Sequence, residues 1–255
     1  MPYGAPCWFE LATSDQPPVK RFYGRLFNWR AKDEPIPDGQ GAYTVFYNGD
    51  ASVAAAYSVG PDMADGAFQP HWMVYFEVSD ADAAAARVVE LGGTVAAGPF
   101  DVMNQGRMVV AVDPTGVAFN LWQPLDNPGV QSMQADNSVV WVELATHDVE
   151  RTQAFYSALL TWEIQDYGGN YRMFRTGGRD WGGFLPMDEK WGDAPSQWNI
   201  YFQVADLNDT VALAQQEGGE LNIPPFEAPG VGWIAGLADI SGASFFVVKL
   251  TPASV

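Results

Sequence analysis

Two glutamates at equivalent positions are the residues of this chain best suited to chemistry. Glu10 lies in the octapeptide WFELATSD (residues 8–15) and Glu143 in the octapeptide WVELATHD (residues 141–148). Each carboxyl group falls in the middle of an apolar stretch, where burial would raise its pKa by disfavouring the charged form. Such a group acts as a general base or acid. A carboxylate bonded to the backbone or to a neighbouring tyrosine, with a structural role, is the alternative.

The two octapeptides belong to a repeat that covers most of the chain. Their spacing is 141 − 8 = 133 residues, and Trp29 returns as Trp162 at the same spacing. Later residues repeat at 198 − 72 = 126, with Gly92 returning as Gly218. Because repeats fold as equivalent units, each copy is expected to carry an equivalent site, diverged where the residues differ.

Hydrophobic periodicity predicts the elements that position the first glutamate. A strand over residues 7–13 is followed by a helix whose apolar residues, from Val19 to Phe27, fall on one face. Asp15 is the expected N-cap of this helix. Strands over residues 43–47 and 52–59 then follow.

The same order of elements is predicted again within this half. A strand over residues 72–78 leads to Asp80, the expected cap of an alanine-rich helix that stops at Gly92-Gly93. Three strands follow, near residues 94–97, 108–112 and 117–122. The tetrapeptide Asp113-Pro114-Thr115-Gly116 between the last two is typical of a type I turn.

The sequence therefore predicts an α+β protein of four βαβββ modules, at residues 6–60, 70–124, 138–186 and 196–250. We expect two domains, residues 1–124 and 138–255, joined by a linker over residues 125–137, with shorter linkers at 61–70 and 186–196. The sequence leaves open whether the first module pairs with the second or with the fourth. It also leaves open whether the protein is a monomer or a homodimer.

These motifs resemble the vicinal oxygen chelate superfamily, which includes glyoxalase I, bleomycin- and fosfomycin-resistance proteins and extradiol dioxygenases. The resemblance rests on W-x-E-L-x-T-x-D…F-Y…L-F-x-W, F-x-V-x-D, L-G-G and D-P-x-G…L-W-Q, and it covers all four modules. It implies two glyoxalase-like, cup-shaped domains of curved sheet, each around a pocket. Because this scaffold hosts many chemistries, the function must be argued from the site.

Strand alternation places Trp8 and Glu10 on one face, which lines the pocket if the helix covers the other face. The predicted ligand-binding residues, found in the same way, are Trp8, Tyr75, Glu77, Asn120, Trp122, Trp141, Asn199, Tyr201 and Gln203. Aromatic rings with few charges favour an apolar or aromatic ligand. Glu77 has Gln203 as its counterpart, and this lost charge favours one catalytic cup and one structural cup.

The resemblance also raises the question of a metal ion. Metal-using relatives place His, Gln or Glu on the pocket face, at positions that here hold Trp8, Trp141, Met73, Asn199, Asn120 and Phe246. Imidazole, thiolate and carboxylate groups bind divalent ions in proteins, and none of these six side chains offers one. We predict no cofactor. A divalent metal held by Glu10, Glu77, Asn120 and His71 is the disfavoured alternative.

Composition limits the partners. The chain has 31 acidic and 13 basic side chains and a net charge of −18, which disfavours nucleic acid and anionic membranes. A single cysteine excludes an internal disulfide framework. No apolar run approaches the roughly 18 residues of a membrane span, and no signal peptide is recognisable, so a cytoplasmic protein is expected.

Three functions follow from these residues. The first is a metal-free enzyme of lyase or isomerase type in secondary metabolism, with Glu10 or Glu143 as the acid/base. The second is a non-catalytic protein that sequesters a small molecule, similar to the bleomycin-resistance proteins. The third is a metal-dependent glyoxalase or dioxygenase, which the fold resemblance alone supports.

Overall fold

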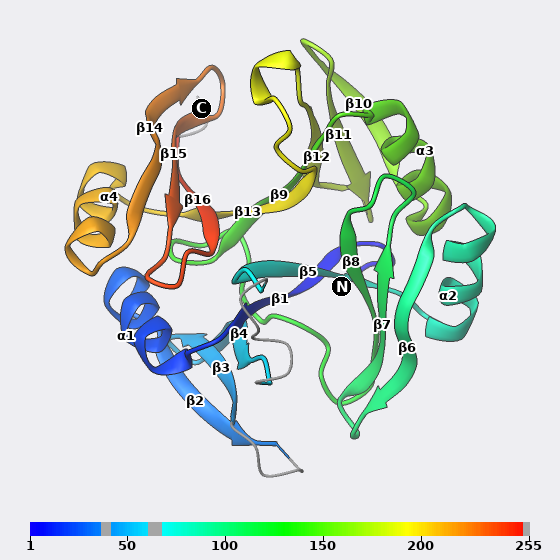
Figure 1. Cartoon of the computed structure of the whole chain (residues 1–255), viewed down its shortest axis with the longest axis horizontal. Helices are drawn as coiled ribbons and strands as arrows, with labels where there is room; N and C mark the ends of the chain where they lie inside the picture. The colour runs from blue at the N-terminus through cyan, green and yellow to red at the C-terminus, as the bar shows by residue number, and fades with distance from the viewer. Residues whose placement is uncertain (37–41, 61–67, 252–255) are drawn as a thin grey trace. The chain divides into compact units, whose positions relative to one another are not determined.

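The computed structural model describes residues 1–36, 42–60 and 68–251. The order of a strand, a helix and three strands occurs four times (Figure 1), which confirms the α+β class and the four βαβββ modules. The first module contains β1 (Pro6–Thr13), α1 (Gln16–Phe27), β2 (Arg30–Pro35), β3 (Ala42–Asn48) and β4 (Ala51–Ser58). The second contains β5 (His71–Glu77), α2 (Ala81–Glu90), β6 (Thr94–Val102), β7 (Gly106–Val112) and β8 (Ala118–Pro124).

The second half of the chain repeats this order. The third module contains β9 (Val139–Thr146), α3 (Val149–Leu160), β10 (Glu163–Gly168), β11 (Tyr171–Thr176) and β12 (Arg179–Pro186). A short 3-10 helix, η1 (Glu189–Trp191), precedes the fourth module. That module contains β13 (Gln197–Gln203), α4 (Leu207–Gln216), β14 (Glu220–Ala228), β15 (Gly232–Ala238) and β16 (Ser244–Leu250). Between Pro124 and Val139 there is no helix or strand.

Each half of the sequence supplies one eight-stranded mixed sheet. The strand orders are β2-β3-β4-β1-β5-β8-β7-β6 and β10-β11-β12-β9-β13-β16-β15-β14. Within every module the first strand runs parallel to the last, as in β1 with β4 and β9 with β12. The three strands after each helix form antiparallel hairpins.

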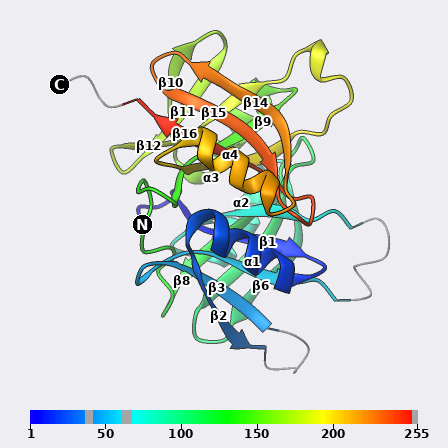
Figure 2. The ribbon, with the colours of Figure 1, turned by 90° about the vertical axis from the view of Figure 1, so that its left-hand side faces the viewer.

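The chain also divides into two compact units. The first unit contains Met1–Trp8, Met73–Gly129 and Val142–Asn199, and the second contains Phe9–Trp72, Val130–Trp141 and Ile200–Val255. In the first unit α2 packs against α3, and in the second α1 packs against α4 (Figures 1 and 2). The sequence left open which module pairs with the first. Helix packing pairs the first module with the fourth, and strand pairing joins the first module to the second.

A buried tyrosine anchors the helix pair of the second unit. The Tyr23 hydroxyl donates to Oδ2 of Asp239 at 3.0 Å and accepts from Nε1 of Trp72 at 3.0 Å. Asp239 is itself held by the backbone N–H groups of Ser241 and Ala243, at 2.7 and 3.1 Å. Burial, and then the charge of Asp239, raise the pKa of Tyr23 well above its ordinary value. The buried carboxylate is thus stabilised by several hydrogen bonds.

The first unit has an equivalent tyrosine with a looser contact. Tyr156 accepts from Nε1 of Trp198 at 3.2 Å, and burial and then the charge of Asp113 raise its pKa. Oδ2 of Asp113 has no partner among the described residues at normal hydrogen-bond geometry, although a weaker contact with Asp113 also raises the pKa of Tyr156. The predicted turn is confirmed, since the Gly116 N–H donates to the Asp113 carbonyl oxygen at 3.0 Å.

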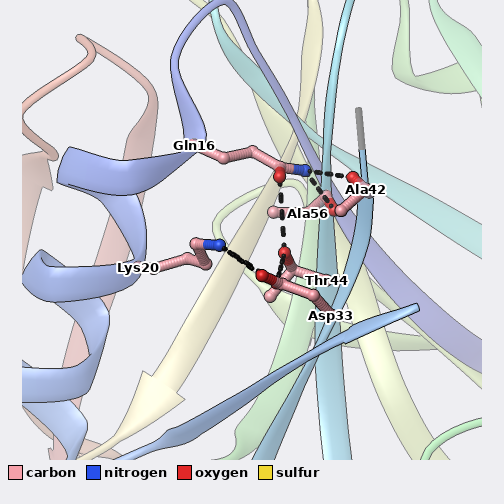
Figure 3. A network of polar contacts seen from close by, with 6 residues as sticks. All are labelled: Gln16, Lys20, Asp33, Ala42, Thr44 and Ala56. Atoms are coloured by element: carbon pink, nitrogen blue, oxygen red, sulfur yellow. Dashed lines mark hydrogen bonds and ion pairs between the residues drawn. The ribbon is translucent and has the colours of Figure 1, made fainter. Parts of the chain in front are cut away.

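The start of α1 is fixed by a buried amide. Asp15 precedes the helix as predicted, but its side chain makes no capping hydrogen bond. Instead, Nε2 of the buried Gln16 donates to the carbonyl oxygens of Ala42 and Ala56, at 2.9 and 2.8 Å (Figure 3). The first residue of the helix is thereby tied to β3 and β4. At the second helix the predicted cap is confirmed, because Asp80 accepts from the backbone of Ala83.

The sequence did not predict β2, because its residues are polar and mostly exposed and show no apolar alternation. It is held by its pairing with β3 and by Asp33. Oδ1 of Asp33 accepts from the Thr44 hydroxyl at 2.7 Å, and Lys20 of α1 lies 2.9 Å from Oδ2 (Figure 3). The Thr44 bond and then the Lys20 bond lower the pKa of Asp33.

The longest helices, α1 and α3, have 12 residues each. Within the described ranges, none of the helices has both the length and the apolar character needed to cross a bilayer.

Candidate functional site

The two predicted catalytic glutamates occupy equivalent places in their modules. Glu10 lies on β1 in the second unit and Glu143 lies on β9 in the first unit, and each is 6% exposed. Their cross-strand neighbours are Ala55 on β4 and Gly183 on β12. The predicted burial of both carboxyl groups is therefore confirmed, whereas their neighbours differ.

Glu143 is bonded to a tyrosine that the sequence analysis missed. The Tyr171 hydroxyl, on β11, donates to Oε2 of Glu143 at 2.8 Å. The tyrosine lies directly against Gly183, where an added Cβ atom would clash with the phenol oxygen. A strand-interior glycine marks such close approaches, so Gly182-Gly183 was the signal that could have identified this contact.

Tyr57 is an aromatic neighbour of Glu10. Tyr57 lies two residues beyond Ala55 on β4, next to β1. Burial, and then the negative charge of Glu10, raise the pKa of Tyr57 to about 12. At the position of Gly183, the first copy has Ala55, which carries a methyl group.

Several predicted ligand-binding residues of the first unit share one sheet face. Tyr75 pairs with Asn120, and Glu77 pairs with Trp122, across β5 and β8. The opposite face carries Phe119, whose ring packs against Tyr156 of α3 at 5.1 Å. By strand alternation, the predicted residues therefore lie on the face that points away from this helix.

The polar groups on this face differ in how they are bonded. Asn120 is 2% exposed, and its Oδ1 has no hydrogen-bond partner among the described residues. Nε1 of the buried Trp122 donates to the Asn127 carbonyl oxygen at 3.0 Å. The buried Asn120 acceptor lacks the partner that such groups nearly always have. Trp8, also in the first unit, is buried on β1.

Glu77 borders a small hollow of the first unit. The hollow has a volume of about 280 Å³ and is lined by Tyr3, Glu77, Val78, Ser79, Gln123 and Pro124. Oε2 of Glu77 lies 2.9 Å from the Met1 amino group. Glu77 is the one predicted ligand-binding residue in this lining.

The equivalent face of the second unit is apolar. Tyr201 stacks on Phe246 with a centroid distance of 4.6 Å and an interplanar angle of 14°. They belong to an apolar cluster with Val140, Trp141, Val231, Ile234 and Val248. Phe246 occupies the position that corresponds to Asn120 in the first half (120 + 126).

Two further predicted residues are engaged by the protein itself. Nε2 of Gln203 donates to Oδ1 of Asp136 at 2.9 Å, in the second unit. In the first unit, Oδ1 of Asn199 accepts from Nε2 of Gln197 at 3.0 Å. These bonds hold both amides in place.

The residues at the expected metal positions do not fit a divalent ion. Trp8, Trp141 and Phe246 have no metal-binding group, and Oδ1 of Asn199 is already bonded to Gln197. Across the described residues, no three His, Cys, Asp or Glu side chains gather in a way that could hold a metal ion. His71 and His147 each bond a backbone carbonyl oxygen, of Gln69 and Ala194.

The fold and these residues define a class of protein: tandem βαβββ modules with aromatic faces and buried glutamates. The sequence profile of the Glyoxalase/Bleomycin resistance protein/Dioxygenase superfamily matches residues 7–121, and a Bleomycin resistance protein-like N-terminal profile matches residues 138–177. The chain belongs to this superfamily, as its curated relatives also indicate.

Two groups of relatives cover nearly the whole chain. The "Putative glyoxylase CFP32" of Mycobacterium bovis is 36% identical over 253 residues, which cover 98% of this chain and 96% of that protein. The "Anthracycline biosynthesis protein DauV" of Streptomyces sp. (strain C5) is 34% identical over 277 residues, which cover 98% of this chain and 94% of that protein.

Solved structures share the fold at low identity. The Mn(II)-bound glyoxalase from Novosphingobium aromaticivorans has a TM-score of 0.64 at 14% identity, covering 98% of this chain and 85% of that one. The 2,3-dioxygenase LapB from Pseudomonas sp. KL28 has a TM-score of 0.65 at 12% identity, covering 100% and 97%. At these identities the likeness extends to the fold alone.

Proposed function

We propose that this protein binds a mostly apolar, aromatic small molecule and transforms it by acid/base catalysis without a metal ion, as a lyase or isomerase of secondary metabolism. The observation that carries the proposal is Glu143, a buried carboxyl group that accepts a 2.8 Å hydrogen bond from Tyr171. A carboxyl group in such surroundings is suited to removing a proton from bound substrate. Glu10 is the candidate base of the first copy.

The proposed ligand class rests on the aromatic residues. Trp8, Tyr75 and Trp122 in the first unit, and Tyr201 with Phe246 in the second, offer flat apolar contact area. The full set proposed to bind ligand is Trp8, Tyr75, Glu77, Asn120, Trp122, Trp141, Asn199, Tyr201 and Gln203. A relative named for anthracycline biosynthesis supports the same class, because anthracyclines are planar polycyclic aromatic compounds.

The binding experiment uses quinizarin, a planar tricyclic dihydroxyanthraquinone, as the probe. We expect saturable quenching of tryptophan fluorescence by the full chain, with the same Kd before and after dialysis against EDTA. Tyr75→Leu should weaken binding, while Lys190→Ala, at an exposed site on η1, should not. Absence of saturable binding would contradict the proposed ligand class, and loss of binding after EDTA would contradict the metal-free proposal.

A second candidate is a non-catalytic protein that sequesters its ligand. The match of residues 138–177 to the bleomycin-resistance profile favours it. A bacterium sensitive to an anthracycline separates the two functions. Sequestration predicts equal protection by the wild type and by Glu143→Gln with the drug unchanged, whereas catalysis predicts a converted drug and loss of conversion in the variant.

A further inference from the structure

The hollow that Glu77 borders joins a carboxylate to a space for a small molecule. Its volume of about 280 Å³ is near the lower end of the range for small-molecule sites. Oε2 of Glu77 is buried and makes no hydrogen bond of normal geometry with the described residues, although the Met1 amino group lies 2.9 Å from it. Buried acceptors nearly always have such bonds, so this oxygen lacks a well-aligned donor.

The equivalent position of the second copy shows what Glu77 lacks. The segments beside β5 and β13 bond to the backbone of Glu77 and Gln203 in the same way. The Gln203 amide donates to Asp136 at 2.9 Å, so donor and acceptor satisfy each other. Tyr3 stands at the position of Asp136 (136 − 133), and its hydroxyl donates to the Leu159 carbonyl oxygen at 3.0 Å instead. The first copy thus has a charged carboxylate where the second has a satisfied amide.

The charges around Glu77 favour a cation. Of the described residues that line the hollow, Glu77 alone has a charged side chain. Burial, and then the charge of Glu77, raise the pKa of the fully buried Cys7 thiol, while the Met1 ammonium lowers it. The amide of Gln123, also in the lining, is held by the Ala81 N–H, which donates to its Oε1 at 2.9 Å. A net charge of −18 adds a long-range attraction for cations.

We infer that this hollow binds a small organic cation whose primary ammonium group donates to the carboxylate of Glu77. The Met1 amino group shows that an ammonium nitrogen fits 2.9 Å from Oε2. Tyr3 and Pro124 in the lining offer apolar contact to the carbon atoms that such a cation carries. The site gives Glu77 a specific ligand group, and it does not require the acid/base catalysis proposed for Glu143.

The Met1 amino group can leave the site at little cost. Met1 is 40% exposed, and ion pairs near the surface contribute little to stability. The residues that follow have bonds of their own. The Pro2 carbonyl oxygen accepts from the Ala5 N–H at 3.0 Å, and the Tyr3 carbonyl oxygen accepts from the Thr176 hydroxyl at 2.7 Å. A bound ammonium group therefore replaces one cation by another while the segment stays in place.

The probe is 4-fluorobenzylamine, a primary ammonium ion at neutral pH, followed by fluorine NMR with the full chain. We expect saturable binding, and binding of the neutral 4-fluorobenzyl alcohol weaker by about tenfold or more, because it cannot form a charge-assisted bond. Glu77→Gln should weaken binding of the amine by a similar factor. Glu90→Gln is the matched control, since it removes a charge from an exposed position on α2, and it should leave binding unchanged.

Ser79→Phe provides a variant that retains Glu77. Ser79 lines the hollow and is exposed, so the larger side chain should fill the hollow and block the probe, with circular dichroism reporting whether each variant is folded. Equal binding of the amine and the alcohol, undiminished binding of the amine by Glu77→Gln, or no saturable binding by the wild type would overturn the inference. Quinizarin has no amino group, so its binding tests the proposed function separately.

Discussion

Glu10 and Glu143 have the same sequence context and the same 6% exposure, yet they face different residues on the neighbouring strand. Glu143 faces Gly183 and accepts the Tyr171 proton, whereas Glu10 faces Ala55. Ala55 on β4 and Gly183 on β12 are the residues at the equivalent position of the neighbouring strand. The repeated octapeptide therefore determines burial of the carboxyl group, and residues on the next strands determine its hydrogen bonds.

The buried tyrosines show a second difference between the copies. Tyr23 donates to Asp239 at 3.0 Å, so both oxygens of that carboxylate are bonded. Oδ2 of Asp113, which corresponds to Asp239, has no partner among the described residues at normal hydrogen-bond geometry, although its charge and a weaker contact raise the pKa of Tyr156. The tyrosine and aspartate at equivalent positions are therefore bonded more closely in the second unit than in the first.

The largest expected effect concerns these tyrosines. Tyr23→Phe would leave a charged oxygen of Asp239 and the Trp72 N–H without their partner, at a cost of about 3 kcal/mol. Tyr156→Phe removes one acceptor from Trp198 and should cost about 1 kcal/mol. Urea unfolding measures both free energies. Equal losses would show that the two tyrosine contacts are equivalent.

A smaller effect is expected at the residue facing each glutamate. Gly183→Ala should destabilise the protein by about 1–2 kcal/mol, because Tyr171 must move away from its present position. Ala55→Gly should cost about 0.5–1 kcal/mol through strand entropy alone. If Gly183→Ala instead raised the unfolding free energy, the close contact with Tyr171 would be refuted.

The pH dependence of Tyr57 tests the surroundings of Glu10. The folded pKa of about 12 lies above the ordinary value of 10.0, so its contribution to stability is complete below pH 10 and is lost as the pH rises to about 12. Glu10→Gln should lower this pKa but keep it above 10, because burial is the larger cause. Tyrosinate absorbance during alkaline titration measures it. Glu143→Gln, the control, should leave Tyr57 unchanged.

The smallest effect is expected at the ion pair between Lys20 and Asp33. Lys20→Met should cost at most about 1 kcal/mol, because Asp33 is half exposed. Thr44→Val should cost more, since it removes the 2.7 Å bond from a fully buried residue. Because the pKa of Asp33 is lowered, the stability that these bonds give is lost as the pH falls through that pKa. Acid unfolding of the two variants measures both losses. A larger loss in Lys20→Met than in Thr44→Val would contradict the prediction.

The sequence predicted most elements because their signals are local. Apolar spacing located α1, and Asp80 caps α2 through a bond to a residue three positions away. The polar strand β2 escaped prediction because its pairing with β3, rather than its own periodicity, makes it a strand. For the site, alternation correctly placed Tyr75 and Asn120 together on one face.

By itself, the sequence determined the repeat, the four modules and the burial of Glu10 and Glu143, because these depend on residues close along the chain. Only the tertiary structure decided which groups those carboxylates meet. Tyr171 reaches Glu143 from 28 residues away, and Tyr23 reaches Asp239 from 216 residues away. Such contacts depend on strand register and on packing between distant segments, which no local pattern specifies.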